Sequence, residues 1–254
     1  VVFLVFTAGG SVRPVVAYQE MKRAFIARDP VRARIWLARM VEALDRLGLR
    51  SAVGSIEILS SRAQTYAQEG DIDRAIETMA PIRTRLGAPE WLYQSRLSSM
   101  LDGANEDERA LAAAEEAARL GPKCRTLWAD VAFKRAVVRE DAAGAREAWN
   151  TALTAPESEG FRIVGHVMEG AVLLAEGRHV EAANVLEPPV AQHDPILLGP
   201  FETLRKALYA EALAARGDEA EALELAAQAL LELQAMRERH ISLRMERLIE
   251  RLSQ

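Results

Sequence analysis

The sequence is poor in cysteine and in aromatic residues, and each shortage excludes a class of protein. Cys124 is the only cysteine among 254 residues, which excludes a disulfide framework and any zinc site built from several cysteines. Aromatic residues make up 6% of the chain, and its 10 prolines and 15 glycines are too few for a loop-rich or disordered protein. The remaining composition, 50% hydrophobic and 27% charged, is that of a soluble globular protein.

An excess of positive charge is also missing. The formal net charge is −5, whereas a dedicated nucleic-acid binder is usually strongly basic, so we expect no nucleic-acid partner. Arginine outnumbers lysine by 28 to 4 and alanine is abundant, a bias that indicates a GC-rich bacterial genome. The length suits one or two compact domains or one elongated array.

The abundant alanine favours helix, because alanine loses no side-chain entropy there. Apolar residues recur at spacings of three and four along most of the chain, and no stretch alternates as a half-buried strand would. One such stripe contains Leu223, Ala226, Leu230 and Leu233, which predicts an amphipathic helix. Glycine and proline divide the pattern into short segments. The sequence therefore predicts an all-α protein with many helices of roughly 10 to 16 residues.

The glycines that end these segments stand in a repeated pattern. Gly70, Gly177 and Gly217 each follow a small residue by seven positions and precede an alanine by five. Weaker copies extend the series of equivalent alanines to Ala33, Ala75, Ala110, Ala145, Ala182 and Ala222, with spacings of 42, 35, 35, 37 and 40 residues. A period between 20 and 50 residues is typical of a solenoid.

These residues resemble the tetratricopeptide repeat, in which two antiparallel helices form a unit of about 34 residues. The best-matched stretches are Ile56–Leu86, Phe161–Pro195 and Phe201–Leu233. The resemblance implies a right-handed superhelical α-solenoid of about six helix-turn-helix repeats over residues 15–234. It also implies a C-terminal capping helix over residues 235–254, for which a dimerising or partner-binding helix is the alternative.

The sequence departs from this family at two prolines. Pro81 and Pro188 each stand eleven residues after their turn glycine, inside or at the end of the second helix of the unit. Proline removes a backbone hydrogen bond and clashes with the preceding turn. We therefore expect these two helices to be kinked or shortened.

Residues 1–14 form an apolar segment and a linker. The run from Val1 to Ala8 is too short to cross a bilayer, which needs about 20 residues, and it lacks an initiator methionine, so we expect a fragment or a processed chain. The segment is interpreted either as the end of an upstream membrane helix or as a helix end that packs on the first repeat. Between Glu20 and Arg50, eight basic residues outnumber four acidic ones, which on the membrane interpretation favours the cytoplasmic side. The predicted location is the cytoplasm, with the cytoplasmic face of a membrane as the alternative.

A search for catalytic and metal-binding patterns returns none. No histidine has another histidine or cysteine three or four residues away, where both would face one side of a helix. The chain has neither a phosphate-binding glycine loop nor a nucleophile elbow. Cys124 stands between two cations that could lower its pKa, with an ordinary unpaired cysteine as the alternative. We therefore expect no enzyme activity, cofactor, metal or small-molecule substrate.

The resemblance implies that the first helices of successive units line a concave groove. The residues predicted to bind a partner there are Lys22, Ser60, Gln64, Gln68, Arg96, Ser99, Asp130 and Lys134. Later units present apolar residues instead, for which core packing is the alternative: Val167, Met168, Ala171, Leu174, Ala207 and Ala214. The lysine and asparagine clamp by which some repeats of this family grip chaperone tails does not match.

The predicted function is a non-catalytic scaffold or adaptor that binds a protein segment or a neighbouring subunit. The alternative is a regulatory or sensor arm of a larger signalling or transcription protein.

The small residues of the repeat predict a close contact between the two helices of each unit. Replacing Ala182→Leu should overpack this contact and lower the free energy of unfolding by about 1–3 kcal/mol. Thermal unfolding measures the change, and a variant as stable as the parent would show that the assigned repeat register is wrong.

Overall fold

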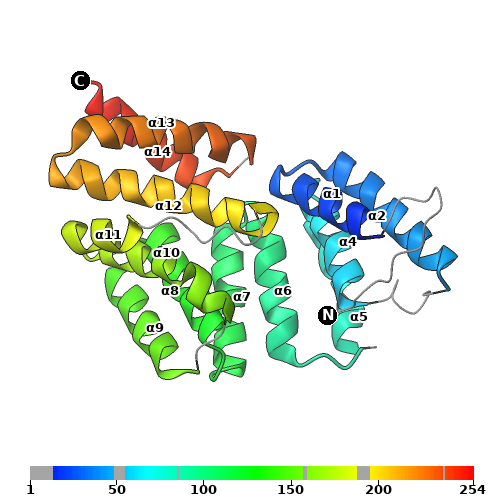
Figure 1. Cartoon of the computed structure of the whole chain (residues 1–254). Helices are drawn as coiled ribbons and strands as arrows, with labels where there is room; N and C mark the ends of the chain where they lie inside the picture. Colours follow the sequence, from blue (N-terminus) through cyan, green and yellow to red (C-terminus); the bar gives the residue numbers. More distant parts are fainter. Residues whose placement is uncertain (1–13, 49–54, 85, 157–158, 188–194, 237) are drawn as a thin grey trace. The chain divides into compact units, whose positions relative to one another are not determined.

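The computed structural model describes residues 14–48, 55–84, 86–156, 159–187, 195–236 and 238–254 (Figure 1). All regular secondary structure in these ranges is helical, which confirms the predicted fold class. The chain divides between Glu106 and Asp107 into two compact units. The first unit ends at Glu106, the second begins at Asp107, and each is described by itself. The prediction of one continuous repeat array over residues 15–234 stays a prediction.

In its described residues the first unit contains two helix pairs and a fifth helix. Its helices are α1 (Pro14–Ile26), α2 (Pro30–Arg46), α4 (Ile56–Gln68), α5 (Ile72–Thr84) and α6 (Glu90–Asp102). Helix α1 packs on α2 and α4 packs on α5, while α6 packs on both α4 and α5. Met21, Phe25 and Leu37 belong to the core between the first three helices.

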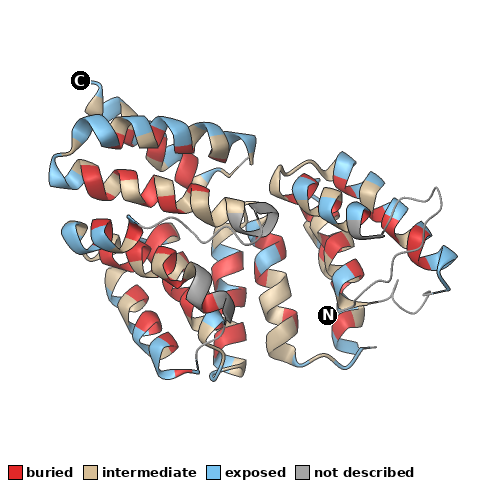
Figure 2. Cartoon of the chain, in the orientation of Figure 1, coloured by how far each residue is buried: buried red, intermediate tan, exposed pale blue. Residues whose placement is uncertain are grey.

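The described part of the second unit contains eight helices. They are α7 (Asp107–Leu120), α8 (Arg125–Val138), α9 (Ala142–Thr154), α10 (Glu159–Ala175), α11 (His179–Leu186), α12 (Pro195–Arg216), α13 (Glu219–Ala235) and α14 (His240–Leu252). The pairs α8–α9, α10–α11 and α12–α13 each pack closely. Buried residues lie along the sides of these helices that meet their neighbours, and exposed residues lie along the other sides (Figure 2).

A left-handed residue stands at the same place in all six predicted units, five positions before the repeat alanine. Glycine occupies it at Gly70, Gly177 and Gly217, with φ of 88°, 72° and 93°. In the other three units the residue is not glycine: Arg28, Asn105 and Glu140 have φ of 45°, 58° and 54°. The six repeat alanines that follow are fully buried. The predicted register is therefore confirmed at every unit, including those without glycine.

The residue after the left-handed position begins the next helix in several turns. Asp29, Asp71 and Asp141 accept hydrogen bonds from the backbone N–H groups three residues on, at 3.0, 3.2 and 2.9 Å. Aspartate at such a position satisfies a backbone donor that the helix leaves free. A left-handed residue followed by aspartate thus ends one helix and starts the next within a few residues.

The predicted close contact of the paired helices is clearest between α10 and α11. A Cβ atom built on Gly170 would lie 2.4 Å from Cγ of Leu186, so only glycine fits there without a shift. Ala182 and Leu186 on α11 have no exposed surface. The offsets that define the repeat in the sequence therefore mark residues that touch across one hairpin.

The two prolines act differently. Pro81 lies inside α5, which continues to Thr84. Helix α11 has only eight residues and ends at Leu186, as expected of a helix that Pro188 shortens; Pro188 itself lies outside the described residues.

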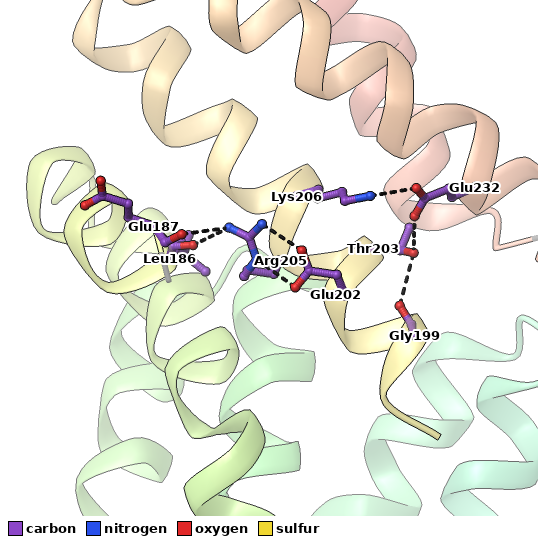
Figure 3. Close-up of polar contacts among 8 residues, drawn as sticks. All are labelled: Leu186, Glu187, Gly199, Glu202, Thr203, Arg205, Lys206 and Glu232. Atoms are coloured by element: carbon purple, nitrogen blue, oxygen red, sulfur yellow. Dashed lines mark hydrogen bonds and ion pairs between the residues drawn. The ribbon is translucent and has the colours of Figure 1, made fainter. Parts of the chain in front are cut away.

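The free end of α11 is held by an arginine from the next helix. Arg205 on α12 is 7% exposed, and its Nη1 donates to the carbonyl oxygen of Leu186 at 2.6 Å (Figure 3). Its Nε and Nη2 donate to the carboxylate of Glu202 at 2.9 and 2.8 Å. The buried guanidinium is therefore neutralised and hydrogen-bonded, as burial of a charge requires. This network joins α11 to α12.

A second network joins α12 to α13. Thr203 and Lys206 donate to the two carboxylate oxygens of Glu232 at 2.6 and 2.7 Å (Figure 3). Burial alone would raise the pKa of Glu232, but the hydrogen bonds from Lys206 and Thr203 outweigh it and the pKa is lowered. The carboxylate therefore remains ionised and acts as a structural bridge.

The last helix packs on the last hairpin, as predicted for a capping helix. Ile241, Met245 and Leu248 of α14 are buried where α14 packs against α13 and α12. At its start, Glu238 accepts hydrogen bonds from the backbone N–H groups of Ile241 and Ser242 at 2.8 and 3.2 Å. This carboxylate caps the helix.

The predicted membrane-derived segment falls mostly outside the described residues, because α1 begins at Pro14. Across the part of the chain that the structure describes, no helix combines the length and the apolar character needed to cross a membrane.

The turn geometry generates a stability prediction. Glu140 is exposed and holds a left-handed conformation, which costs a residue with a Cβ roughly 1–2 kcal/mol. Glu140→Gly should therefore raise the free energy of unfolding by about 0.5–1 kcal/mol, since the greater entropy of unfolded glycine offsets part of the gain. Urea titration followed by circular dichroism measures the change.

Glu147→Gly provides the matched control, because Glu147 is also exposed but lies in the interior of α9. The free energy of unfolding of this variant should fall by about 1 kcal/mol. If both variants lost stability equally, the left-handed turn would contribute no strain.

Candidate functional site

Six of the predicted binding residues lie in the first unit. They stand on α1, α4 and α6, each of which is the first helix of a predicted repeat. They are Lys22, Ser60, Gln64, Gln68, Arg96 and Ser99, which we call the polar row. The helices that carry them are joined by direct contacts, described in turn below.

Helices α4 and α6 run in a fixed register. Arg96 Nη2 lies 2.6 Å from Glu57 Oε1, and a Cβ built on Gly103 would lie 3.0 Å from Gln64 Nε2. Both pairs are 39 positions apart, as are Ser60 and Ser99. The two serines therefore lie at the same level of the two helices, between the Glu57–Arg96 pair and Gln64.

Helix α1 joins the row through Gln68 and Lys22. Gln68 Nε2 donates to the backbone oxygen of Phe25 at 3.1 Å, which ties the end of α4 to α1. Lys22 lies close enough to Glu57 and Arg96 for both charges to act on its pKa. The structure thus brings the six predicted residues of the first unit onto three neighbouring helices.

The polar row has two cations, Lys22 and Arg96, and of these Lys22 is the one without a paired carboxylate among the described residues. Burial lowers its pKa, Glu57 opposes this shift, and Arg96 adds to it. Among the described residues its ammonium has no ion pair or hydrogen bond, and its one contact of note is the ring of Tyr18, 5.4 Å from Nζ. The carboxylate of Glu57 is already paired with Arg96, so an anion brought to this place would face an available cation.

Two other atoms of the row lack hydrogen-bond partners within the described part of the chain. Ser60 Oγ and Gln68 Oε1 are both buried and unpaired, which costs about 1–3 kcal/mol for each group. They are closed off from solvent, so a ligand would reach them only after the side chains rotate. Ser99 is exposed, and its hydroxyl donates to the backbone oxygen of Ser95 at 3.2 Å.

Sequence reasoning missed two features of this surface. Glu57 precedes Ser60 by three residues and Gln64 by seven, a spacing that places all three on one face of α4, so helical periodicity could have found it. Arg28 donates to Asn105 and to the backbone oxygen of Asp102, the latter at 3.2 Å. No sequence signal joins these residues, which lie more than 70 positions apart.

Asp130 and Lys134, the other two predicted residues, belong to the second unit. Lys134 is 6% exposed, and its Nζ lies 3.2 Å from Asp130 Oδ1. A paired and buried lysine has little access to a partner. The binding role of these two residues stays a prediction.

Most of the apolar residues predicted along the second half of the groove are core residues. Val167, Met168, Ala171 and Ala207 are buried, as the core-packing alternative requires.

The described residues contain no group of three or more histidine, cysteine or acidic side chains that could hold a metal ion. Cys124 is half-buried, and its Sγ lies 3.2 Å from Thr126 Oγ1.

Comparison with known proteins yields little. No family model matches the chain, and no curated protein matches it. One similar solved structure is the TPR2AB domain of yeast Sti1 in complex with pHSP90, at 15% identity and a TM-score of 0.34, over 95% of this chain and 98% of that chain. The helical-hairpin fold therefore rests on the helices, turns and buried alanines of this chain itself.

His166 on α10 generates a pH prediction. Burial lowers its pKa below the ordinary value of 6.5, the Arg205 charge adds to this shift, and Glu202 opposes it. Its Nε2 is buried without a hydrogen-bond partner among the described residues. Below pH 6.5 the unfolded chain therefore takes up a proton before the folded chain does, and stability falls until the lowered folded pKa is passed.

The replacement His166→Gln removes this titration. We expect the variant to lose less stability than the parent between pH 7 and pH 5, as measured by urea unfolding at both values. Equal losses in the two proteins would rule out a destabilising protonation of His166.

Proposed function

We propose that the chain is a non-catalytic interaction scaffold that binds a segment of a partner protein along the polar row. The observation that supports this most strongly is the half-buried Lys22, whose ammonium lacks an ion pair among the described residues while Glu57 beside it is paired with Arg96. A carboxylate of the partner would compensate this cation. Charge-assisted hydrogen bonds of that kind are about twice as strong as neutral ones.

The rest of the row suits an extended segment. Each residue of an extended chain offers one backbone donor and one acceptor, and the amide of Gln64 and the hydroxyl of Ser99 can pair with both kinds. In the register of α4 and α6, Ser99 is level with Ser60, one helical turn from the level of Gln64, and this spacing supports contact with successive parts of one segment. We therefore propose that the partner contributes a short acidic segment held partly by its backbone.

The sequence supports two further details of this proposal. The arginine-to-lysine ratio of 28 to 4 supports a bacterial origin, and the basic residues between Glu20 and Arg50 support a cytoplasmic location, with attachment to a membrane as the alternative.

Site-specific photocrosslinking tests the proposed surface in the cells that produce the protein. The photoreactive residue p-benzoylphenylalanine replaces Gln64 or Ser99 within the row. It replaces Glu77, which is exposed on α5, as the control. We expect irradiation to yield an adduct of one defined mass from the two row positions and none from position 77. An absence of adducts from the row, or equal yields at position 77, would falsify the proposed surface.

Two lysine replacements then test whether the cation of Lys22 binds the partner. Lys22→Ala should reduce the adduct yield at position 99 about fivefold, equivalent to roughly 1 kcal/mol. Lys123→Ala, which removes an exposed lysine from the turn before α8, should leave it unchanged. Equal effects of the two replacements would show that Lys22 does not bind the partner.

A further inference from the structure

A cavity of about 820 Å³ lies within the second unit, where α8, α10, α12 and α14 meet. Ligand sites commonly have volumes of 300–1,000 Å³. Its lining includes Leu174 and Ala175 from α10, Ala214 from α12, and Leu252 from α14. The alanines leave open a space that larger side chains would fill. None of the polar row lines this cavity.

The α14 side of the cavity is a fixed wall. Arg244 donates from Nε and Nη2 to the two carboxylate oxygens of Glu211 on α12, and both side chains are less than a fifth exposed. At the start of the helix, His240 Nε2 lies 2.8 Å from the backbone oxygen of Val137 on α8. Leu248 of α14 is also buried, so the helix is held in place by contacts within the protein itself. A preformed wall lowers the cost of binding a ligand.

The arginines that line the cavity differ in how their charge is compensated. Arg244 is paired with a carboxylate, as are several arginines of the second unit outside the cavity, namely Arg135, Arg139, Arg146, Arg178, Arg205 and Arg216. Arg247 and Arg251 line the cavity, are exposed, and have no carboxylate within ion-pair distance among the described residues. Arg247 donates to the backbone oxygen of Leu243 on its own helix, at 3.2 Å.

Two carboxylates complete the lining. Glu140, in the turn after α8, and Glu219, at the start of α13, are also exposed and also lack an ion pair within the described ranges. The cavity thus combines an apolar part with two exposed cations on α14 and two exposed anions on other elements. A nucleic acid or an anionic lipid, whose charge is negative throughout, would meet unfavourable charge at Glu140 and Glu219.

We propose that this cavity is a second peptide-binding site, independent of the polar row. Its ligand is a segment in which an aliphatic side chain is flanked by an acidic residue and a basic residue. The aliphatic group packs against Leu174 and Ala214, the carboxylate pairs with the planar guanidinium groups of Arg247 and Arg251, and the cation faces Glu140 and Glu219. Arginine suits this role because its fork of N–H donors matches a carboxylate.

The test starts from a random heptapeptide library displayed on phage and selected on the full chain. We expect the enriched peptides to carry an acidic and an aliphatic residue within a few positions of each other. Fluorescence anisotropy with a synthetic peptide of the enriched sequence then gives the Kd. Arg251→Glu should weaken binding about tenfold or more.

Three matched variants show whether the peptide binds in the cavity or elsewhere on the chain. Ala214→Leu fills the apolar part without changing the charge and should also weaken binding. Arg239→Glu makes the same charge change at an exposed arginine that precedes α14, and Gln64→Ala alters only the polar row; both should leave the Kd within about twofold. Circular dichroism confirms that each variant is folded.

The proposal is overturned if no peptide is enriched, if the enriched peptides lack an acidic residue, or if Arg251→Glu and Ala214→Leu bind as the parent does. Loss of binding in Gln64→Ala alone would assign the peptides to the polar row and overturn the cavity as their site. Because the photocrosslinking experiment probes the first unit, its outcome is separate from this one.

Discussion

The architecture depends on how closely two helices can approach within each hairpin. Gly170 meets Leu186 at a distance that leaves no room for a Cβ atom, and the repeat alanines have no exposed surface. Small residues at these contacts let the backbones come together, and larger neighbours then fill the spaces beside them. The helix pairs that pack closely within each unit are joined by very short turns, and each of these turns includes a left-handed residue. The contact and the turn are two parts of one constraint.

Much of this was predictable because small residues and glycine leave clear marks in a sequence. Gly70, Gly177 and Gly217 gave the repeat its register, and the equivalent alanines are buried as expected. The remaining turns have Arg28, Asn105 and Glu140 at this position, and these residue types do not predict a left-handed conformation as glycine does. These repeats match the pattern weakly in the sequence, although the backbone at the turn position is left-handed in them too. The turn needs a conformation, and glycine is only the least costly way to supply it.

The candidate site was less predictable, because it depends on contacts between helices. The face of α4 that carries Ser60 and Gln64 follows from helical periodicity. The pairing of Glu57 with Arg96 depends on the 39-residue offset between α4 and α6, which neither helix encodes alone. Likewise, nothing local distinguishes the buried Lys134 from the partly exposed Lys22. The family resemblance and helical periodicity thus indicated candidate residues, while packing decided which of them are accessible.

The capping of α11 by Arg205 has a consequence for how this part of the chain acquires order. Helices shorter than about 12 residues are marginal in isolation, and α11 has eight residues. Its last carbonyl groups are satisfied by a guanidinium from α12, and its inner face is closed by Gly170 on α10. Helix α11 therefore depends for its stability on its contacts with α10 and α12. Its backbone amides would be protected from hydrogen exchange only while α12 is in place, so local opening of α12 releases both helices as one cooperative unit.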